Sequence, residues 1–297
     1  MVRTGIFGTL EFGPDEFEAY DSLDDLFQDK SGRGHGSDYD YVLVCTKSHD
    51  SERAASELST HPEILGGRGK IVLFQNGWGN AEIFNDHFPK NRIYNARVIT
   101  GFQRPQKNVV DVTVHADSIH LGSLFGSDLA PMGTLVEAIT KGGIPAEVVE
   151  NIGKDLWAKM LYNCALNPPR RHIQRPLRRT GRVAICEWPY SREIMEAVIK
   201  EIFSVMEATG YRTHWSTPEE YTAVFYEKLP PTVRHESSTL QDIRSKKATE
   251  IEALSGAVVR LGEEAGVPTP CNWTLYKMVK FMEGRNCRRG KKANLHI

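Results

Sequence analysis

The sequence predicts an α/β plus α protein, in which a truncated domain with a parallel sheet is followed by an all-helical domain. In the first half, short apolar runs alternate with amphipathic segments, as expected of strands and helices that alternate in a parallel sheet. From about Asn151 onward, apolar residues recur at helical spacing. We therefore expect an incomplete α/β domain over residues 1–145, a helical domain over 146–284 and a basic, disordered tail over 285–297.

The first domain is predicted to contain buried parallel strands. Tyr41–Cys45 is a continuous apolar run, as expected of a strand buried on both faces, and Ile71–Phe74 is a second such run. Further along, 109–116 and 118–122 alternate in polarity and are expected to form an antiparallel pair. The other elements expected in this domain are helices 51–58, 81–88 and 129–140 and strands 92–99 and 146–149.

The second domain is predicted to be helical throughout. Ser191–Gly210 is a long amphipathic segment that ends on glycine, a common residue at helix C-termini. The other helices expected in this domain are 218–228, one or two within 237–266, and 272–283.

Composition excludes several classes of function. With 297 residues, 40% of them hydrophobic, and a net charge of −1, the chain has no global field that would attract nucleic acid or an anionic membrane. No apolar run approaches the roughly 20 residues of a membrane span, and no signal peptide is recognisable. The five cysteines are scattered, which favours reduced thiols in a cytoplasmic protein and predicts no metal site.

Lys159, Asn163 and Asn167 are the most informative residues of the chain. Their spacing of four places an ammonium and two amides along one face of a helix that we expect to end at Pro168. Such a row suits a small ligand with an oxygen to polarise and polar groups to anchor. The alternative is an exposed ion pair between Lys159 and Asp155, four residues earlier.

Four motifs in order resemble the ketopantoate reductases (2-dehydropantoate 2-reductases). These are Asp40–Lys47, Gln75–Gly79, the helix with Lys159, and the segment from Ser237 to Glu250. The resemblance covers roughly residues 38–283. It implies an N-terminal Rossmann-type domain for NADPH, a helical C-terminal domain and an active site in the cleft between them.

The resemblance also implies roles for individual residues. Lys159 matches the catalytic lysine, which donates a proton to the ketone oxygen. The matches to substrate-binding positions are Asn163, Asn167 and Ser238, and those to cofactor-side positions are Lys47, Asn76, Gly101 and Glu250. Hydride addition to a ketone builds negative charge on oxygen, and a nearby ammonium stabilises that charge and supplies the proton.

Each of these residues also has a structural interpretation. Asn76 with Gly77 is typical of a plain turn, and a lysine such as Lys47 after a strand is usually solvated. Ser238 and the serine before it suit a helix cap. Glu250 is four residues from Lys246, at the spacing of a helical ion pair.

The chain departs from the family at its beginning. The family opens with a strand and a G-x-G-x-x-G loop that holds the cofactor pyrophosphate, whereas Gly5-Ile-Phe-Gly8 has a different spacing. About 60 residues, two βα units of roughly 30 residues each, have no counterpart. We expect Tyr41–Cys45 to lie at an open, apolar sheet edge, and our hypothesis is a truncated chain that binds NADPH poorly.

A second departure follows the lysine helix. Six arginines fall within Pro169–Arg182, where the family has an apolar segment, and Leu177 stands where the family often has a polar substrate contact. Our hypothesis is a local frameshift, because a one-base shift can restore the family pattern. A nucleic-acid interface is the alternative, but no aromatic residues interleave these arginines.

The predicted function is the NADPH-dependent reduction of 2-dehydropantoate to pantoate in pantothenate biosynthesis. The expected partner is a small 2-keto acid, and a homodimer is possible; nucleic acid and membranes are not expected partners. Two alternatives stay open. One is a reductase of another 2-keto acid, and the other is a catalytically impaired family member that acts as a binding or dimerisation module.

Overall fold

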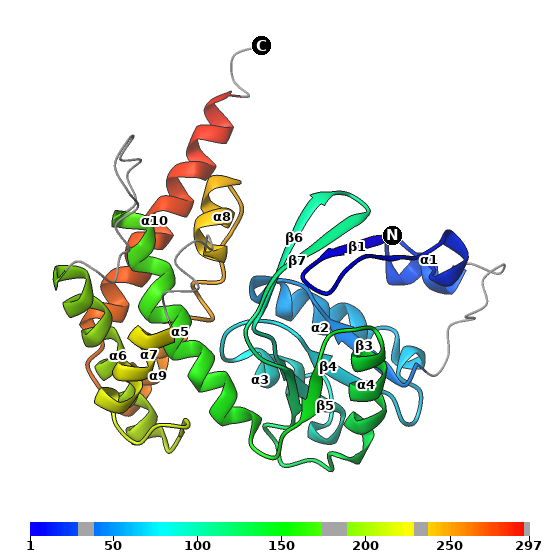
Figure 1. Cartoon of the computed structure of the whole chain (residues 1–297), viewed down its shortest axis with the longest axis horizontal. Coiled ribbons are helices and arrows are strands. Elements are labelled where there is room, and N and C mark those ends of the chain that lie inside the picture. Colours follow the sequence, from blue (N-terminus) through cyan, green and yellow to red (C-terminus); the bar gives the residue numbers. More distant parts are fainter. Residues whose placement is uncertain (29–38, 174–188, 229–236, 294–297) are drawn as a thin grey trace. The chain divides into compact units, whose positions relative to one another are not determined.

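The structure is a computed structural model that describes residues 1–28, 39–173, 189–228 and 237–293 (Figure 1). The chain divides into two compact units. The sheet unit comprises residues 1–46, 50–75 and 80–152, and the helical unit comprises 47–49, 76–79 and 153–297. Two short segments that follow strands of the sheet are thus packed with the helices.

The main sheet of the sheet unit has the strand order β3-β4-β5-β8-β9. Its strands are β3 (Tyr41–Val44), β4 (Lys70–Leu73), β5 (Ile93–Arg97), β8 (Ile119–Gly122) and β9 (Ala146–Val148). The first three run parallel, β8 is antiparallel to β5, and β9 is parallel to β8. The predicted parallel sheet is therefore confirmed, with an antiparallel step where β8 joins it.

Helices cover both faces of this sheet, as the continuous apolar strands predicted. Ile71 and Leu73 of β4 pack in one hydrophobic cluster with α2 (Ser51–Ser59) and α3 (Asn80–Asn85). Val72, between them, points into a second cluster. That cluster includes residues of α4 (Ala130–Lys141), which Figure 1 shows on the opposite side of the sheet. Alternate residues of one strand thus face opposite cores.

Strand β3 lies at one end of the strand order, so the expected sheet edge is present in the described part of the chain. Leu43 of this strand is 44% exposed. Val44, the next residue, is 7% exposed and faces the core. One face of β3 is therefore packed, while its other face carries an exposed leucine.

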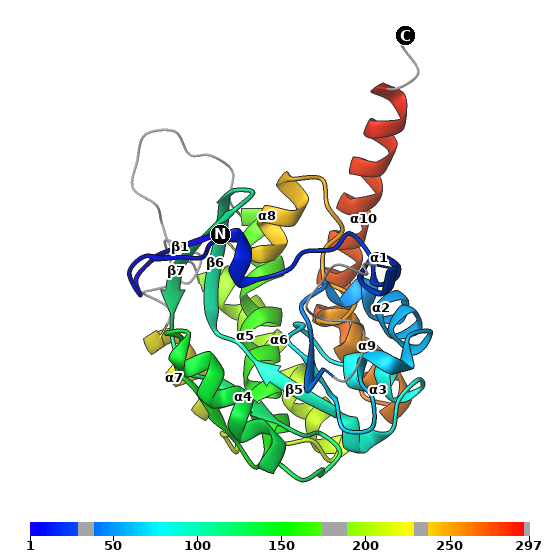
Figure 2. The same ribbon diagram turned by 90° about the vertical axis from the view of Figure 1, so that its right-hand side faces the viewer.

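A second sheet contains the N-terminus and has the order β2-β1-β7-β6 (Figure 2). It consists of β1 (Val2–Gly5), β2 (Leu10–Glu11), β6 (Thr100–Gln106) and β7 (Val109–His115). The expected pairing of 109–116 with 118–122 is wrong. Strand β7 pairs with β6 and β1, whereas Ile119–Gly122 forms β8 of the main sheet. Alternating polarity predicts a strand but not its partner.

The helical unit is built from α5 to α10. Their bounds are α5 (Ile152–Ile173), α6 (Pro189–Thr209), α7 (Pro218–Lys228), α8 (Ser238–Arg244), α9 (Ser255–Ala265) and α10 (Pro270–Ala293). Fully buried residues of α6, such as Met195 and Ile202, form much of the core. Among the described residues, no helix is both long enough and apolar enough to cross a membrane.

Two helices extend further than expected. Helix α5 continues past Pro168 to Ile173, although a proline inside a helix removes a backbone donor and crowds the preceding turn. Helix α10 extends to Ala293, where we expected a disordered tail from Arg285; its lysines and arginines are good helix formers. Strand β9 pairs with β8, and the compact helical unit contains the chain from Gly153 onward, while the domain boundary near residue 145 stays a prediction.

Candidate active site

Helix α5 carries the predicted row of polar residues. Lys159 and Asn163 are half-buried, and Asn167 is 5% exposed. The Asn167 Nδ2 donates to Asn163 Oδ1 at 3.4 Å, which links the two amides. The predicted spacing thus brings at least the two asparagines together on one face.

The predicted apolar positions of α5 are buried, whereas Lys159 and Asn163 of this row are half-buried. The predicted apolar positions of this helix are all at most 6% exposed: Leu156, Met160, Leu161 and Leu166. Asp155, the alternative partner of Lys159, accepts from His214 Nε2 at 3.0 Å. A half-buried lysine and two linked amides therefore share one face of α5, while its predicted apolar positions face the core.

A second polar group gathers around Glu250, which is 4% exposed. Its Oε2 accepts from Asn76 Nδ2 at 3.1 Å and lies 3.4 Å from Lys47 Nζ. Its Oε1 accepts from the backbone N–H of Ser48 at 3.3 Å. Three of the residues predicted on the cofactor side therefore form one hydrogen-bonded group within the helical unit. Lys47 is therefore paired with Glu250 and is not a purely solvated side chain. The partners of the Glu250 carboxylate are Lys47, Asn76 and Ser48, and not Lys246.

Asp242 completes this group, and the sequence analysis missed it. Lys47 Nζ lies 3.0 Å from Asp242 Oδ2. The signal was available, because Asp242 falls on the buried face of α8 together with Leu240 and Ile243. A carboxylate on the apolar face of a short amphipathic helix needs a partner, and Lys47 is that partner.

The two carboxylates keep the Lys47 amine charged. Burial alone lowers the pKa of Lys47, but the charge of Glu250 and the hydrogen bond to Asp242 outweigh it. The net result is a pKa above the ordinary value for lysine. Lys47 therefore acts as a fixed cation that holds two carboxylates and is unsuited to acid–base chemistry near neutral pH.

Local capping positions these acidic residues. Ser237 is the N-cap of α8, and its hydroxyl accepts from the Leu240 N–H at 3.4 Å, so the predicted capping interpretation is confirmed for Ser237. After α8, the Thr249 N–H and hydroxyl both donate to Glu283 Oε1 at 2.7 Å. This bond ties the residue next to Glu250 to helix α10 and so limits the positions that its carboxylate can adopt.

Two predicted residues lie outside these groups. Ser238 is exposed in the first turn of α8, and its substrate contact stays a prediction. Gly101 lies in β6 of the sheet unit, where its carbonyl accepts from Thr113 Oγ1 at 3.1 Å. Its cofactor contact also stays a prediction. Leu177 and most of the arginine-rich segment lie outside the described residues.

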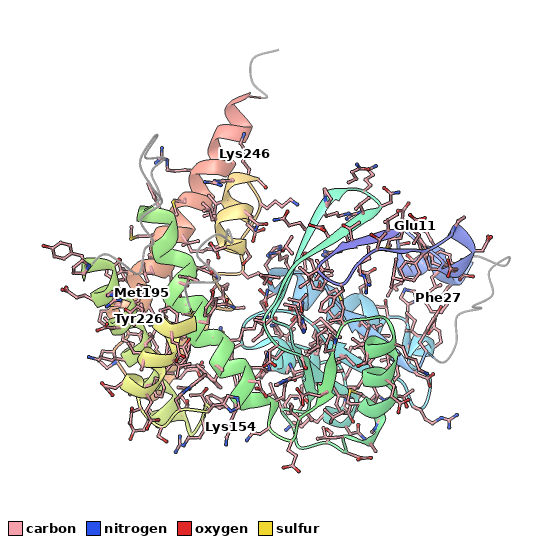
Figure 3. The ribbon with its side chains drawn as sticks, in the orientation of Figure 1. Glu11, Phe27, Lys154, Met195, Tyr226 and Lys246 are labelled. Carbon is pink, nitrogen blue, oxygen red and sulfur yellow. The ribbon has the colours of Figure 1, made fainter. Side chains whose placement is uncertain are left out.

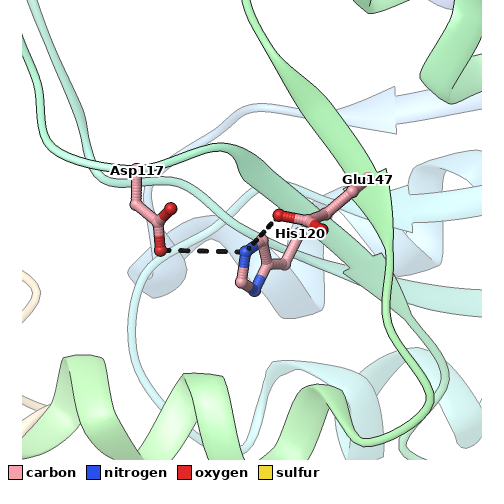
Figure 4. Close-up of side chains that lie close together, drawn as sticks. All are labelled: Asp117, His120 and Glu147. Atoms are coloured by element: carbon pink, nitrogen blue, oxygen red, sulfur yellow. Dashed lines mark ion pairs between the residues drawn. The ribbon is translucent and has the colours of Figure 1, made fainter.

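Within the described ranges, one group of three side chains has the spacing of metal ligands (Figure 4). His120 Nε2 lies 3.0 Å from Glu147 Oε1 and 3.8 Å from Asp117 Oδ2. The buried Arg97 guanidinium is 3.0 Å from the same Asp117 oxygen and also contacts the His120 ring. Because a guanidinium already pairs with one of the two carboxylates and contacts the histidine, this group is better described as an ion-pair network than as a metal site.

This architecture and sequence match those of known proteins. The family model "Ketopantoate reductase PanE/ApbA" matches residues 17–126, and "Ketopantoate reductase PanE/ApbA C terminal" matches 151–283. The 2-dehydropantoate 2-reductase of Aquifex aeolicus is 36% identical over 246 residues, which are 82% of this chain and 76% of that protein. The enzyme of Halobacterium salinarum is 28% identical over 83% of this chain and 77% of its own length. The crystal structure of 2-dehydropantoate 2-reductase from Geobacter metallireducens superposes with a TM-score of 0.79 at 18% identity, over 94% of this chain and 85% of that one.

The sheet unit, the helical unit and these matches together define a dinucleotide-dependent oxidoreductase. More narrowly, the chain belongs to the ketopantoate reductase family. The resemblance seen in four short motifs is confirmed across both units.

Proposed function

We propose that this protein reduces 2-dehydropantoate to pantoate with NADPH, as a step of pantothenate biosynthesis. The observation that carries the proposal is the row on α5, where Lys159 and Asn163 are half-buried at a spacing of four and Asn163 accepts a hydrogen bond from the buried Asn167. Membership of the family and the names of the relatives supply the substrate.

Lys159 is the proposed proton donor. Reduction forms a carbon–hydrogen bond at C2 of the keto acid and leaves negative charge on the former carbonyl oxygen. The Lys159 ammonium stabilises that charge and then donates a proton to the oxygen, which yields the hydroxyl of pantoate. Bulk solvent afterwards restores the proton on the amine.

The amides of Asn163 and Asn167 are proposed to orient the substrate. An amide group offers both a donor and an acceptor, so it can bind the carboxylate and the hydroxyl of the keto acid. The hydrogen bond between these amides holds their orientation before substrate arrives. Ser238, exposed at the start of α8, is proposed as a further substrate contact.

The residues of the Glu250 group fit the reacting end of a nicotinamide cofactor. Lys47 and Asn76 follow the carboxyl ends of β3 and β4, where ligands of open α/β sheets bind, and Glu250 adds an acceptor. When bound, NADPH would supply the hydride. The glycine-rich turn that holds a pyrophosphate in this fold has no counterpart in the described residues, so the fit concerns the reacting end alone.

That mismatch supports a second candidate function. With β3 at an open sheet edge and no pyrophosphate loop among the described residues, the chain would be a catalytically impaired family member that acts as a binding or dimerisation module. A reductase of another 2-keto acid is the third possibility.

One assay separates the three candidates. NADPH oxidation is followed at fixed protein concentration with 2-dehydropantoate and with a panel of other 2-keto acids. Binding of NADPH and of NADH is measured by calorimetry on the same preparation. The proposal predicts NADPH binding and fastest turnover with 2-dehydropantoate. Faster turnover with another keto acid would replace the substrate. Binding of neither NADPH nor NADH, with no turnover, would contradict the proposed function.

A further inference from the structure

We propose that Trp78 is a positioning residue, which fixes Asn76 beside Glu250 by anchoring the loop 76–79 to helix α5. This inference rests on the proposed function only for the role of Asn76. The anchor itself is a property of four residues that follow a sheet strand yet belong to the helical unit.

The loop has a backbone that requires an anchor. Gly77 and Gly79 flank Trp78 and both have positive φ, at 92° and 101°. Glycine adopts positive φ at the lowest conformational cost, but it also gives a loop without other contacts the most conformational freedom. A loop with glycine on either side of one large side chain therefore takes its position from that side chain.

The side chain of Trp78 anchors this loop. Its side chain is 5% exposed, and its ring lies 4.9 Å from the Trp157 ring and 4.7 Å from the Tyr211 ring, centroid to centroid. Trp157 and Tyr211 are also in contact with each other, at 5.3 Å. Three aromatic rings in mutual contact bury a large apolar area in preferred tilted and edge-on geometries.

The backbone of the loop 76–79 is also held, by contacts with Ala253. The Trp78 N–H donates to the Ala253 carbonyl at 2.8 Å. A Cβ on Gly77 would lie 2.5 Å from the Ala253 Cβ and oxygen, so no other residue fits there without displacing the loop. Ala253 is three residues after Glu250, and its own N–H donates to the Glu250 carbonyl at 3.1 Å. The loop is therefore pinned to the turn that carries the carboxylate.

The anchor connects two predicted functional groups. Asn76, two residues before Trp78, donates to Glu250 at 3.1 Å. Trp157, on which Trp78 packs, lies two residues before Lys159 on α5. Removing the indole would leave the hydrogen-bonding atoms of Asn76 intact but release the loop that presents them. Trp78 would then affect the reaction without touching substrate or cofactor.

Amide hydrogen exchange tests the anchor without any need for activity. Exchange is measured on the intact chain for the amide of residue 78 in wild type, Trp78→Ala and Trp78→Phe. We expect exchange to speed up by about tenfold or more in Trp78→Ala, because the opening becomes local, and to change little in Trp78→Phe, which keeps a ring. Met195→Ala, which removes a fully buried side chain of α6 in the same unit, is the matched control and should leave this amide protected. Unchanged exchange in Trp78→Ala would overturn the proposal.

Kinetics then test the role assigned to Asn76. In Trp78→Ala we expect kcat/KM to fall by about tenfold or more, with the KM for NADPH rising more than the KM for the keto acid. In an Asn76→Ala background the same change should cost little further, whereas Met195→Ala should have the same effect in both backgrounds. Additive losses would show that Trp78 does not act through Asn76.

Two complications have defined outcomes. If Trp78→Ala does not fold, Trp78→Leu, which keeps apolar bulk but no ring, takes its place in both comparisons. If the wild-type chain has no turnover, the proposed function fails, while the exchange experiment still decides whether Trp78 anchors the loop.

Discussion

The polar side chains around Glu250 in the helical unit are buried or half-buried, whereas many apolar side chains of the N-terminal sheet are exposed. Around Glu250, charged and amide side chains are buried or half-buried and bonded to one another. In the sheet formed by β1, β2, β6 and β7, Val112 is the only buried strand residue, although apolar side chains abound. The exposed apolar residues at or near this sheet include Met1, Ile6, Leu10, Phe12 and Phe102, each at least 39% exposed.

This difference predicts where substitutions will have the largest effects. Burying a charged group costs free energy unless it is paired, so a change to a buried and paired carboxylate should be costly. Exposed apolar residues on a sheet contribute little to the folded state. We therefore expect substitutions in the helical unit to have large effects and those in the N-terminal sheet to have small ones.

The largest effect on stability should come from the core of α6. Ile202 is fully buried, and Ile202→Ala should lower the free energy of unfolding by about 2–5 kcal/mol through lost burial and a residual cavity. Phe102→Ala in β6, where the side chain is 47% exposed, should cost under about 1 kcal/mol. Urea titration of both variants measures the contrast. Equal losses would mean that the N-terminal sheet is packed against a partner.

Glu250→Gln should have an intermediate effect. The amide oxygen can still accept hydrogen bonds, but the NH₂ that replaces the other oxygen then faces either the Ser48 N–H or the donors of Lys47 and Asn76. The free energy of unfolding should fall by about 1–3 kcal/mol. Glu264→Gln, at an exposed position of α9, is the control and should be neutral. If both substitutions are neutral, the hydrogen bonds to Glu250 contribute nothing to the fold.

The pairing of Lys47 should appear as a pH dependence. Its pKa is raised in the folded state, so the stabilisation is complete below the unfolded value of about 10.4 and is lost as pH rises through the folded pKa. The effect should be small because the side chain is 40% exposed. Stability of wild type and Lys47→Gln is compared from neutral pH to above pH ~10.4. The difference between them should shrink only at the alkaline end, and a constant difference would argue against the charge pairing.

Asp117 in the sheet unit should behave with the opposite sign. Burial raises its pKa, but Arg97 outweighs burial, and the net pKa is lowered. Its stabilisation is therefore present above the unfolded value of about 3.9 and is lost as pH falls through the folded pKa. Asp117→Asn should remove this acid dependence, and Asp86→Asn, at an exposed position of the same unit, should retain it. This should be the smallest effect, because the Asp117 side chain is 53% exposed.

The local sequence pattern predicted most of the helices and strands, but it did not predict all of the strand pairings. The four-residue spacing from Lys159 to Asn167 was enough to place a polar row on a helix, because helix geometry is set locally. The pairing of β7 with β1 was not predictable, since β1 is more than 100 residues away in the sequence and strand partners are chosen by tertiary packing. The continuation of α5 past Pro168 likewise depends on more than the proline itself.

For the candidate site, the sequence suggested residues but not the contacts between them. Resemblance selected Lys47, Asn76 and Glu250, and the structure brings these three together. It did not select Asp242, whose role becomes visible only when Lys47 is seen beside it. Trp78 was missed for the same reason, because an aromatic residue between two glycines has no assigned role until its stacking partners are known.

Lys159 provides the most direct test of the central claim that α5 presents a proton donor to a keto acid. Lys154, near the start of the same helix, is the matched control (Figure 3). Lys159→Ala and Lys154→Ala are assayed for NADPH oxidation with 2-dehydropantoate, with and without added small primary amines. The account predicts a loss of kcat of about 10²–10⁴-fold for Lys159→Ala, partly restored by the amines, and near wild-type activity for Lys154→Ala. Full activity in Lys159→Ala, or equal losses in both variants, would contradict it.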